Sequence, residues 1–172
     1  MKKYLLLLVP VFLFSFSLIE FKPVDKNDSV TFAIKNFGIS TKGEFKGLKG
    51  SIKWDAANPP SSSFDVSVDV NTINTGIDMR DKDLKKETWF NTAKFGTINF
   101  KSTNVTASTV TGDLTIKGVT KQITFPFTVT PTSTGYVFEG NFSLNRRDFA
   151  VGENSITLSD NVTVSLKVNA IQ

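Results

Sequence analysis

Few side chains in this sequence have the chemistry of a catalyst. The 172 residues include neither cysteine nor histidine, which excludes thiol nucleophiles, imidazole bases and the usual zinc ligands. A serine or threonine nucleophile would need a lysine partner, and no local pattern supplies one. Asp65 and Asp69 lie on the polar side of a strand pattern, where solvation accounts for them, although a glycosidase-like carboxylate pair stays open as an alternative. We therefore expect a protein that is not an enzyme, with no catalytic residues, metal site or cofactor.

The elements that would position any site are mostly strands. In residues 110–129, VTGDLTIKGVTKQITFPFTV, apolar and polar residues alternate on either side of Gly118. This period of two is typical of a strand with one solvated face, and a turn residue between two such runs predicts an antiparallel hairpin. An isolated hairpin is only marginally stable in water. Further strands must therefore cover its apolar face.

The same alternation recurs along the chain and predicts a closed barrel. Glycines recur at short intervals through one further strand pattern, as they do where a sheet bends. A helical pattern occurs in residues 78–90, with Asp78 as the expected N-cap. We predict an all-β protein, a lipocalin-like antiparallel β-barrel of about eight strands with one short helix. The alternating segments are residues 30–34, 64–70, 98–101, 110–117, 123–129, 136–144 and 162–168.

The N-terminal segment differs in kind from the rest of the chain. Lys2 and Lys3 precede an apolar run, and small residues follow at Ser15 and Ser17. This layout is typical of a secretory signal peptide. We assign residues 1–21 to a leader, with Ser17 as the candidate cleavage position, and residues 22–172 to the barrel domain. An uncleaved anchor is the alternative. The expected location is periplasmic or secreted, without stable membrane insertion after cleavage.

The charge of the chain is nearly balanced. Without Lys2 and Lys3, 18 basic residues stand against 16 acidic ones, and the lysines are scattered between polar residues. A nucleic-acid-binding domain normally concentrates its positive charge on one face. We therefore expect no nucleic acid as a partner.

Phenylalanine dominates the apolar positions, with 16 phenylalanines against two tyrosines. Because the alternate positions are mainly Thr, Ser, Lys, Asp and Asn, we expect the apolar face to point inward, the reverse of a membrane-spanning barrel, which remains an alternative. These apolar side chains either line a ligand cavity or fill a solid core. The candidate lumen residues are Phe32, Ile34, Phe45, Ile52, Trp54, Phe100, Leu114, Ile116, Phe125, Phe127, Phe138 and Phe142.

Several motifs follow one another in an order that characterises a known family. They are FGIST (residues 37–41) with Gly43 and Phe45, Arg80-Asp81 with Leu84 before Trp89-Phe90, INFKS (98–102), VTGDLTIKGVTK (110–121) and RDF (147–149). Over residues 30–168 the chain resembles the YceI-like family of secreted lipid-binding proteins, and the hairpin motif is the most specific. The resemblance implies an elongated lipocalin-like barrel whose lumen takes a long polyisoprenoid or other lipid tail. It also implies a periplasmic or secreted carrier rather than an enzyme.

The chain departs from this family at its histidines. Many members have histidine where this sequence has Asn36, Lys82 or Asp83, and Lys117. Contacts to a head group or metal that depend on those imidazoles therefore cannot be transferred to this chain.

Two arginines match the family pattern and are head-group candidates. Arg80 and Arg147 each precede an aspartate. Guanidinium groups suit bidentate phosphate contacts, so these residues either recognise a diphosphate head or form internal ion pairs that fix the helix and the final hairpin. Lys82 is a third candidate, either for an anionic head at the barrel mouth or as part of a solvated helix face.

The leading hypothesis is an exported protein, monomeric or weakly dimeric, that carries or sequesters a long-chain isoprenoid or similar lipid in an apolar lumen. The alternative is a structural or stress-response interaction module with a filled core, which would act through its surface.

Overall fold

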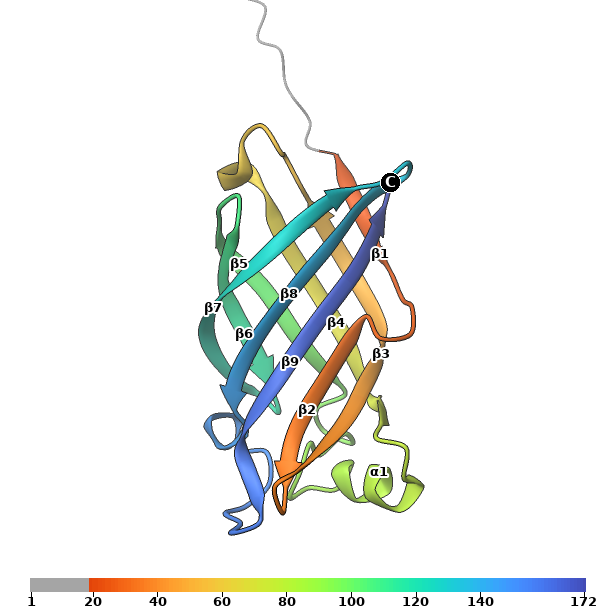
Figure 1. Cartoon of the computed structure of the whole chain (residues 1–172), viewed down its shortest axis with the longest axis vertical. Coiled ribbons are helices and arrows are strands. Elements are labelled where there is room, and N and C mark those ends of the chain that lie inside the picture. The colour runs from red at the N-terminus through yellow and green to blue at the C-terminus, as the bar shows by residue number, and fades with distance from the viewer. Residues whose placement is uncertain (1–18) are drawn as a thin grey trace, which may run out of the picture.

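Nine β-strands form one continuous antiparallel sheet that closes on itself (Figure 1). The computed structural model describes residues 19–172. The strands are β1 (Glu20–Val24), β2 (Val30–Asn36), β3 (Ile39–Lys53), β4 (Ser63–Asn74), β5 (Thr97–Val105), β6 (Thr109–Ile116), β7 (Val119–Pro131), β8 (Gly135–Asn145) and β9 (Leu158–Ile171). The helical elements are η1 (Pro59–Ser61), α1 (Asp78–Leu84) and η2 (Arg146–Phe149). The predicted all-β barrel is confirmed.

Eight of these strands make the closed barrel, and the ninth completes one strand position. Around the barrel the order is β2, β9, β8, β7, β6, β5, β4 and β3, and β3 pairs again with β2. β1 pairs with the end of β3 (Phe21 with Ile52) and with the end of β9, and β2 pairs with the other halves of the same two strands. β1 and β2 are therefore two segments of one interrupted strand.

The central hairpin is the predicted one. Ile116 pairs with Val119 across a turn made by Lys117 and Gly118, whose φ angles are 50° and 76°. Positive φ at both central positions defines a type I′ turn, whose twist matches that of the flanking strands. Glycine adopts this conformation without strain, which explains the position of Gly118.

The start of the barrel differs from the sequence boundary. β1 begins at Glu20, and Phe21 is buried in the core. The folded domain thus includes two residues that the sequence analysis placed in the leader of residues 1–21, while residues 1–18 of that leader lie outside the described part of the chain. Within residues 19–172 no helix has the length and apolar character needed to cross a membrane.

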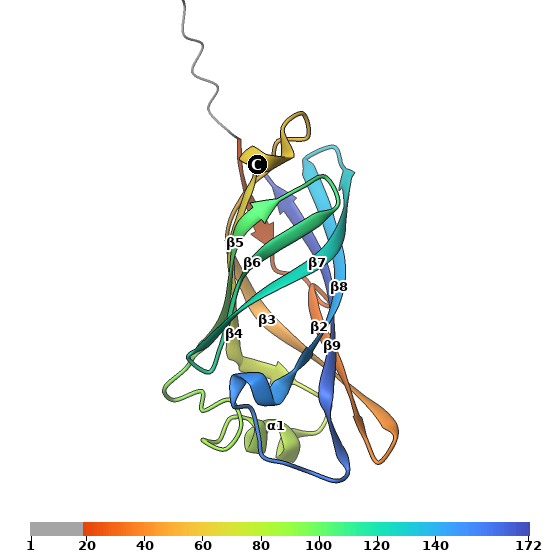
Figure 2. The same ribbon diagram turned by 90° about the vertical axis from the view of Figure 1, so that its left-hand side faces the viewer.

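The helix is shorter than the pattern in residues 78–90 predicts. It ends at Leu84, its N-cap is Ile77 rather than Asp78, and no side chain caps it. Turns follow, and they direct Trp89 and Phe90 toward the barrel interior instead of along a helix face. Figure 2 shows α1 at one end of the barrel, together with the β2–β3 turn and the loop that precedes β9.

The barrel interior is divided into a packed end and a hollow end. At the end away from α1, aromatic rings from several strands pack edge to face; Trp54, for example, lies 5.8 Å from the ring centroids of both Phe127 and Phe138. Phe64 contacts the same two rings. Edge-to-face packing at these distances is favourable beyond the area it buries. We call this cluster the aromatic plug; its buried members are Phe21, Ile52, Trp54, Phe64, Val105, Val110, Phe125, Phe127, Phe138 and Ala170.

Candidate ligand cavity

The hollow end of the barrel contains a cavity of about 770 Å³. Its walls are the inward faces of the barrel strands, and α1, the turns after it and the segment 146–158 surround its opening. Exposed residues such as Ile77, Met79 and Asn154 line its outer part, so the cavity reaches solvent at the α1 end. A volume in this range is typical of small-molecule binding sites.

Most of the predicted lumen residues line this cavity. They are Phe32, Ile34, Phe45, Phe100, Leu114, Ile116, Phe125 and Phe142. The remaining four, Ile52, Trp54, Phe127 and Phe138, do not line it and lie within the aromatic plug. Phe125 belongs to the plug as well, and it also faces the cavity. Alternation shows that a side chain faces inward, but it does not show at which level along the barrel axis side chains pack the interior solid. The filled-core alternative therefore describes one end of the barrel only.

Sequence reasoning missed further apolar wall residues. β9 supplies Val162, Val164, Leu166 and Val168, whose alternation was visible in the sequence. Trp89 and Phe90 also line the cavity, and the ring of Phe90 meets that of Phe45 edge to face at 5.7 Å. The two aromatic residues were assigned to a helix face, which hid their inward orientation.

Glycines in the strands keep the cavity open by letting phenylalanine rings lie against the wall. Gly43 pairs with Phe32, and an ideal Cβ on Gly43 would lie 2.7 Å from Cε1 of that ring. At Gly112 the same construction meets the Phe100 ring. A ring that covers a glycine on the neighbouring strand projects less into the lumen. The strand glycines therefore contribute to the free volume as well as to the curvature of the sheet.

One arginine is buried in the cavity wall, and it is Arg146. Its side chain is only 3% exposed. Nε donates to Ser159 O (3.1 Å), Nη1 to Val151 O (2.9 Å), and Nη2 both to Glu153 O (2.9 Å) and to Asp160 Oδ1 (2.6 Å). Burial lowers the pKa of Arg146, and the nearby Asp160 carboxylate opposes that shift. Four of the five guanidinium N–H groups are thus used, and one on Nη1 remains.

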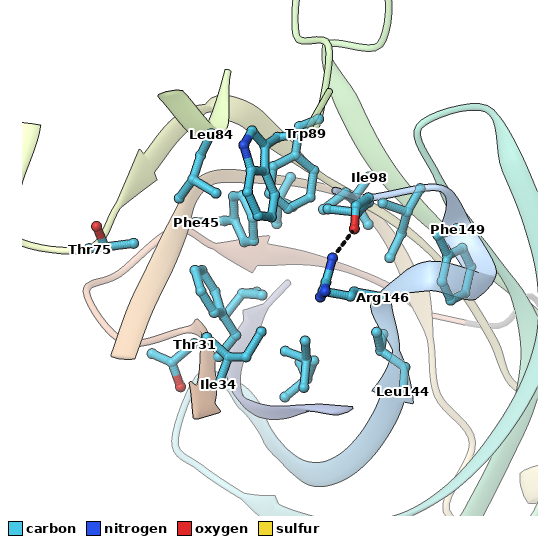
Figure 3. A pocket seen from close by; sticks show the side chains of 18 of the residues that line it. Thr31, Ile34, Phe45, Thr75, Leu84, Trp89, Ile98, Leu144, Arg146 and Phe149 are labelled. Atoms are coloured by element: carbon cyan, nitrogen blue, oxygen red, sulfur yellow. Dashed lines mark hydrogen bonds between the residues drawn. The ribbon is translucent and has the colours of Figure 1, made fainter. Parts of the chain in front are cut away.

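Figure 3 shows Arg146 beside Leu144 and Phe149, opposite Phe45 and Leu84 across the cavity. Its guanidinium also lies over the Trp89 ring, with 5.8 Å between Cζ and the ring centroid. Arg146 is therefore the charged group most deeply embedded among the apolar residues of the wall. Its main contacts are internal, so it fixes the segment 151–160 against the barrel end.

The structure places Arg147, a head-group candidate of the sequence analysis, outside the cavity. Arg147 is exposed and does not line the cavity. The inward alternation of β8 through Phe142 and Leu144 continues to residue 146, so the sequence did contain the signal that selects Arg146. The internal ion pair expected for Arg147 is made by Arg146 with Asp160.

Arg80 lines the cavity near its opening, and Lys82 does not line it. Arg80 Nε donates to Thr75 Oγ1 and its Nη2 to Thr75 O, each at 2.7 Å. Asp81 accepts hydrogen bonds from the backbone N–H and hydroxyl of the same threonine, so Thr75 links the two charged residues. Within the described part of the chain Arg80 has no carboxylate within ion-pair distance. Lys82 is exposed on the outer side of α1.

Hydrogen bonds join the loops around the opening. Gly152 N donates to Thr88 O at 2.9 Å. Lys117 Nζ donates to Ala150 O at 2.7 Å and to Thr88 O at 3.2 Å. Burial lowers the pKa of Lys117. The central hairpin thus fixes the loops that border the cavity.

The chemistry of this site is that of an apolar container whose charged lining residues are two arginines, Arg80 and Arg146, and two carboxylates, Asp83 and Glu153. Within residues 19–172 no group of three or more His, Cys, Asp or Glu side chains is arranged to bind a metal ion. A long apolar molecule matches the walls, and Arg80 is available to a polar end at the opening.

Comparison with known proteins agrees with this geometry. Residues 22–170 match the family model of the YceI-like domain. This chain belongs to the YceI-like family. A UPF0312 protein of Ectopseudomonas mendocina (strain ymp) is 32% identical over 155 residues, which cover 83% of this chain and 81% of that protein. A UPF0312 protein of Yersinia pestis (strain Pestoides F) is 32% identical over 154 residues, 83% of this chain and 80% of that protein.

Solved structures share the barrel of this YceI-like protein. BcnA of Burkholderia cenocepacia superimposes with a TM-score of 0.78 at 25% identity, over 83% of this chain and 95% of that one. A polyisoprenoid-binding domain from Saccharophagus degradans, implicated in plant cell wall breakdown, gives a TM-score of 0.70 at 17% identity, over 90% of this chain and 99% of that one. The second likeness shows a shared fold.

Proposed function

We propose that this YceI-like protein binds a long-chain lipid of the isoprenoid class in the barrel cavity and carries or sequesters it. The observation that carries the proposal is the cavity of about 770 Å³ with apolar walls that opens at the α1 end. A solid core would serve stability better, since interiors normally pack without such voids. The polyisoprenoid-binding domain that shares the fold supports the same ligand class.

Affinity would come mainly from the apolar tail. Each buried methylene contributes about 0.8 kcal/mol before the costs of ordering the tail are subtracted. The polar end of the ligand would lie near Arg80, whose guanidinium lines the cavity near the opening and has no carboxylate partner within residues 19–172. The aromatic plug closes the opposite end, so we propose that the tail enters from the α1 end.

We also propose that the protein is exported and acts in the periplasm or outside the cell, as a monomer or weak homodimer. The leader pattern in residues 1–21 supports export. The role of a carrier needs no catalytic residues.

Native mass spectrometry tests the proposal. The mature protein is purified from its own envelope, and bound lipid is extracted and identified. Val164 lines the cavity, and Val164→Trp is expected to fill part of it and to exclude the lipid. Thr163, its exposed neighbour in β9, gives the matched control Thr163→Trp, which should retain the lipid.

A protein that stays empty after incubation with a polyprenyl phosphate, a quinone and a fatty acid would contradict the proposal. Equal lipid content in folded Val164→Trp and Thr163→Trp would contradict the cavity as the binding site. Circular dichroism of both variants establishes that they are folded.

A further inference from the structure

Large apolar side chains are exposed all around the opening of the cavity. Phe37 is 75% exposed, Met79 76% and Ile156 103%. Ile39 and Ile77 are also largely exposed. They come from three separate segments, the β2–β3 turn, the start of α1 and the loop before β9, which Figures 1 and 2 place at the same end of the barrel. We call these five residues the mouth rim.

Contacts show that the rim segments border one opening. Phe37 N donates to Thr157 O at 2.9 Å, so the tip of the β2–β3 turn lies beside the loop that carries Ile156. Ile77 and Met79 line the cavity itself. Large apolar side chains exposed at one end of a molecule can mark an interaction surface.

The conformation of Phe37 shows that folding does not account for the rim. Phe37 and Gly38 form a two-residue turn with φ angles of 50° and 77°, nearly the same as those of Lys117 and Gly118. A left-handed conformation costs a residue with a Cβ roughly 1–2 kcal/mol, and asparagine, aspartate and glycine are the residues that this turn position favours. The Phe37 ring gains little packing in return because it is 75% exposed. Packing within residues 19–172 therefore does not account for a phenylalanine at this position.

The charges near the rim favour an apolar partner over a polyanion. Residues 78–87 carry four acidic and four basic side chains. Lys35 and Lys42 flank the β2–β3 turn and are exposed. Lysines beside exposed apolar side chains can extend their charged ends toward phosphate groups while the apolar groups are buried.

We propose that the mouth rim docks reversibly on a lipid bilayer and places its apolar side chains at the boundary between head groups and acyl chains. This inference rests on the proposed function: docking would let a lipid pass between the membrane and the cavity without crossing water. A bilayer suits the rim better than a protein partner, because a bilayer seated on all three segments is itself a source of lipid for the opening, whereas a protein seated there would close it. Interfacial apolar groups reach about 5–10 Å into a membrane, so the contact is peripheral.

Flotation with phosphatidylcholine vesicles, with and without phosphatidylglycerol, tests the inference on the mature chain. The wild-type protein is expected to float with both, with only a weak dependence on salt. Phe37→Asn should lower the partition coefficient about tenfold, as expected for the loss of one aromatic side chain from the interface. The same variant should melt at a higher temperature than wild type, because asparagine relieves the backbone strain. A purely structural role of Phe37 predicts the opposite change in melting temperature.

Ile171 provides the matched control. It is an exposed isoleucine at the end of β9, at the barrel end away from α1. Ile156→Ser should lower vesicle binding, and Ile171→Ser should leave it unchanged.

Three results would overturn the inference: no flotation of the wild type, equal flotation of Phe37→Asn, or a rim-dependent dimer in sedimentation that replaces vesicle binding. Mass spectrometry of the same samples reports lipid content separately. Flotation by a protein that never contains lipid would support the docking surface and contradict the proposed function.

Discussion

The guanidinium of Arg146 lies over the indole of Trp89, with 5.8 Å between Cζ and the ring centroid. Arg146 belongs to η2, and Trp89 belongs to the turns after α1. These two segments are far apart in the sequence, and both border the cavity opening. A cation over an indole face is attracted by the ring quadrupole, and more strongly when water is excluded. This contact joins the two segments and makes the opening one structural unit.

Arg146→Met is expected to destabilise the fold by about 3 kcal/mol. The change leaves the carbonyls of Val151, Glu153 and Ser159 without their donor, and each buried acceptor left unsatisfied costs about 1–3 kcal/mol. It also removes the partner of Asp160, whose side chain is 39% exposed and can be solvated instead. Arg147→Met, one residue away and exposed, should change stability by less than about 0.5 kcal/mol. Urea denaturation measures both. Similar losses for the two variants would contradict the assignment of Arg146 as the anchoring residue.

The division of the interior predicts different costs for two phenylalanines. Phe138→Ala opens a void in the aromatic plug and should cost about 3–5 kcal/mol. Phe142 lines the cavity and stacks on Phe125 with centroids 4.7 Å apart. Because part of its ring already faces free space, Phe142→Ala should cost only about 2 kcal/mol. Chemical denaturation gives the loss in free energy of unfolding for each variant. A larger loss for Phe142→Ala than for Phe138→Ala would contradict the assignment of the aromatic plug to the end away from α1.

The barrel could be predicted from the sequence because period-two alternation is a local property of each strand. The hairpin through Lys117 and Gly118 was found in this way, since both strands and their turn carry short-range signals. The extent of α1 was not, because its end depends on Trp89 and Phe90 packing into the cavity. A tertiary contact of this kind overrides the local helical pattern, and the pattern itself contains no signal of it.

The alternation pattern predicted which side chains face the barrel interior, but not at which level along the barrel axis each side chain lies. Alternation placed Phe127 and Phe142 on the inner face alike, yet the first fills the plug and the second lines the cavity. The difference depends on which strands meet at each level, and the barrel shear determines this. Arg147 was selected from a sequence motif, whereas the alternation of β8 indicates Arg146 as the arginine that lines the cavity.

The glycine and ring pairs predict that Gly43→Ala reduces the cavity. The added methyl group would overlap the Phe32 ring, with Cβ 2.7 Å from Cε1, so the ring must turn toward the lumen. Binding of a fluorescent fatty acid should weaken about tenfold, which corresponds to roughly two methylene contacts at ~0.8 kcal/mol each. At Gly96 the nearest atom would be 3.8 Å away, so Gly96→Ala is the control and should bind normally. This prediction depends on the proposed function, and equal affinities would contradict it.

Lys117 predicts a pH effect on stability in the alkaline range. Burial lowers the pKa of Lys117 in the folded state, while the unfolded chain keeps the ordinary value of 10.5. In the window just below that value the unfolded state therefore binds more protons at this residue, so the contribution of Lys117 to stability increases as the pH rises.

The stability difference between wild type and Lys117→Met should move in favour of wild type through this window, because the other lysines titrate alike in both proteins. Arginine keeps its charge throughout, so the difference between Lys117→Arg and Lys117→Met should stay constant. Thermal melts over this range measure both differences, and a wild-type difference that falls with pH would show that Lys117 is not desolvated by its contacts with Thr88 and Ala150.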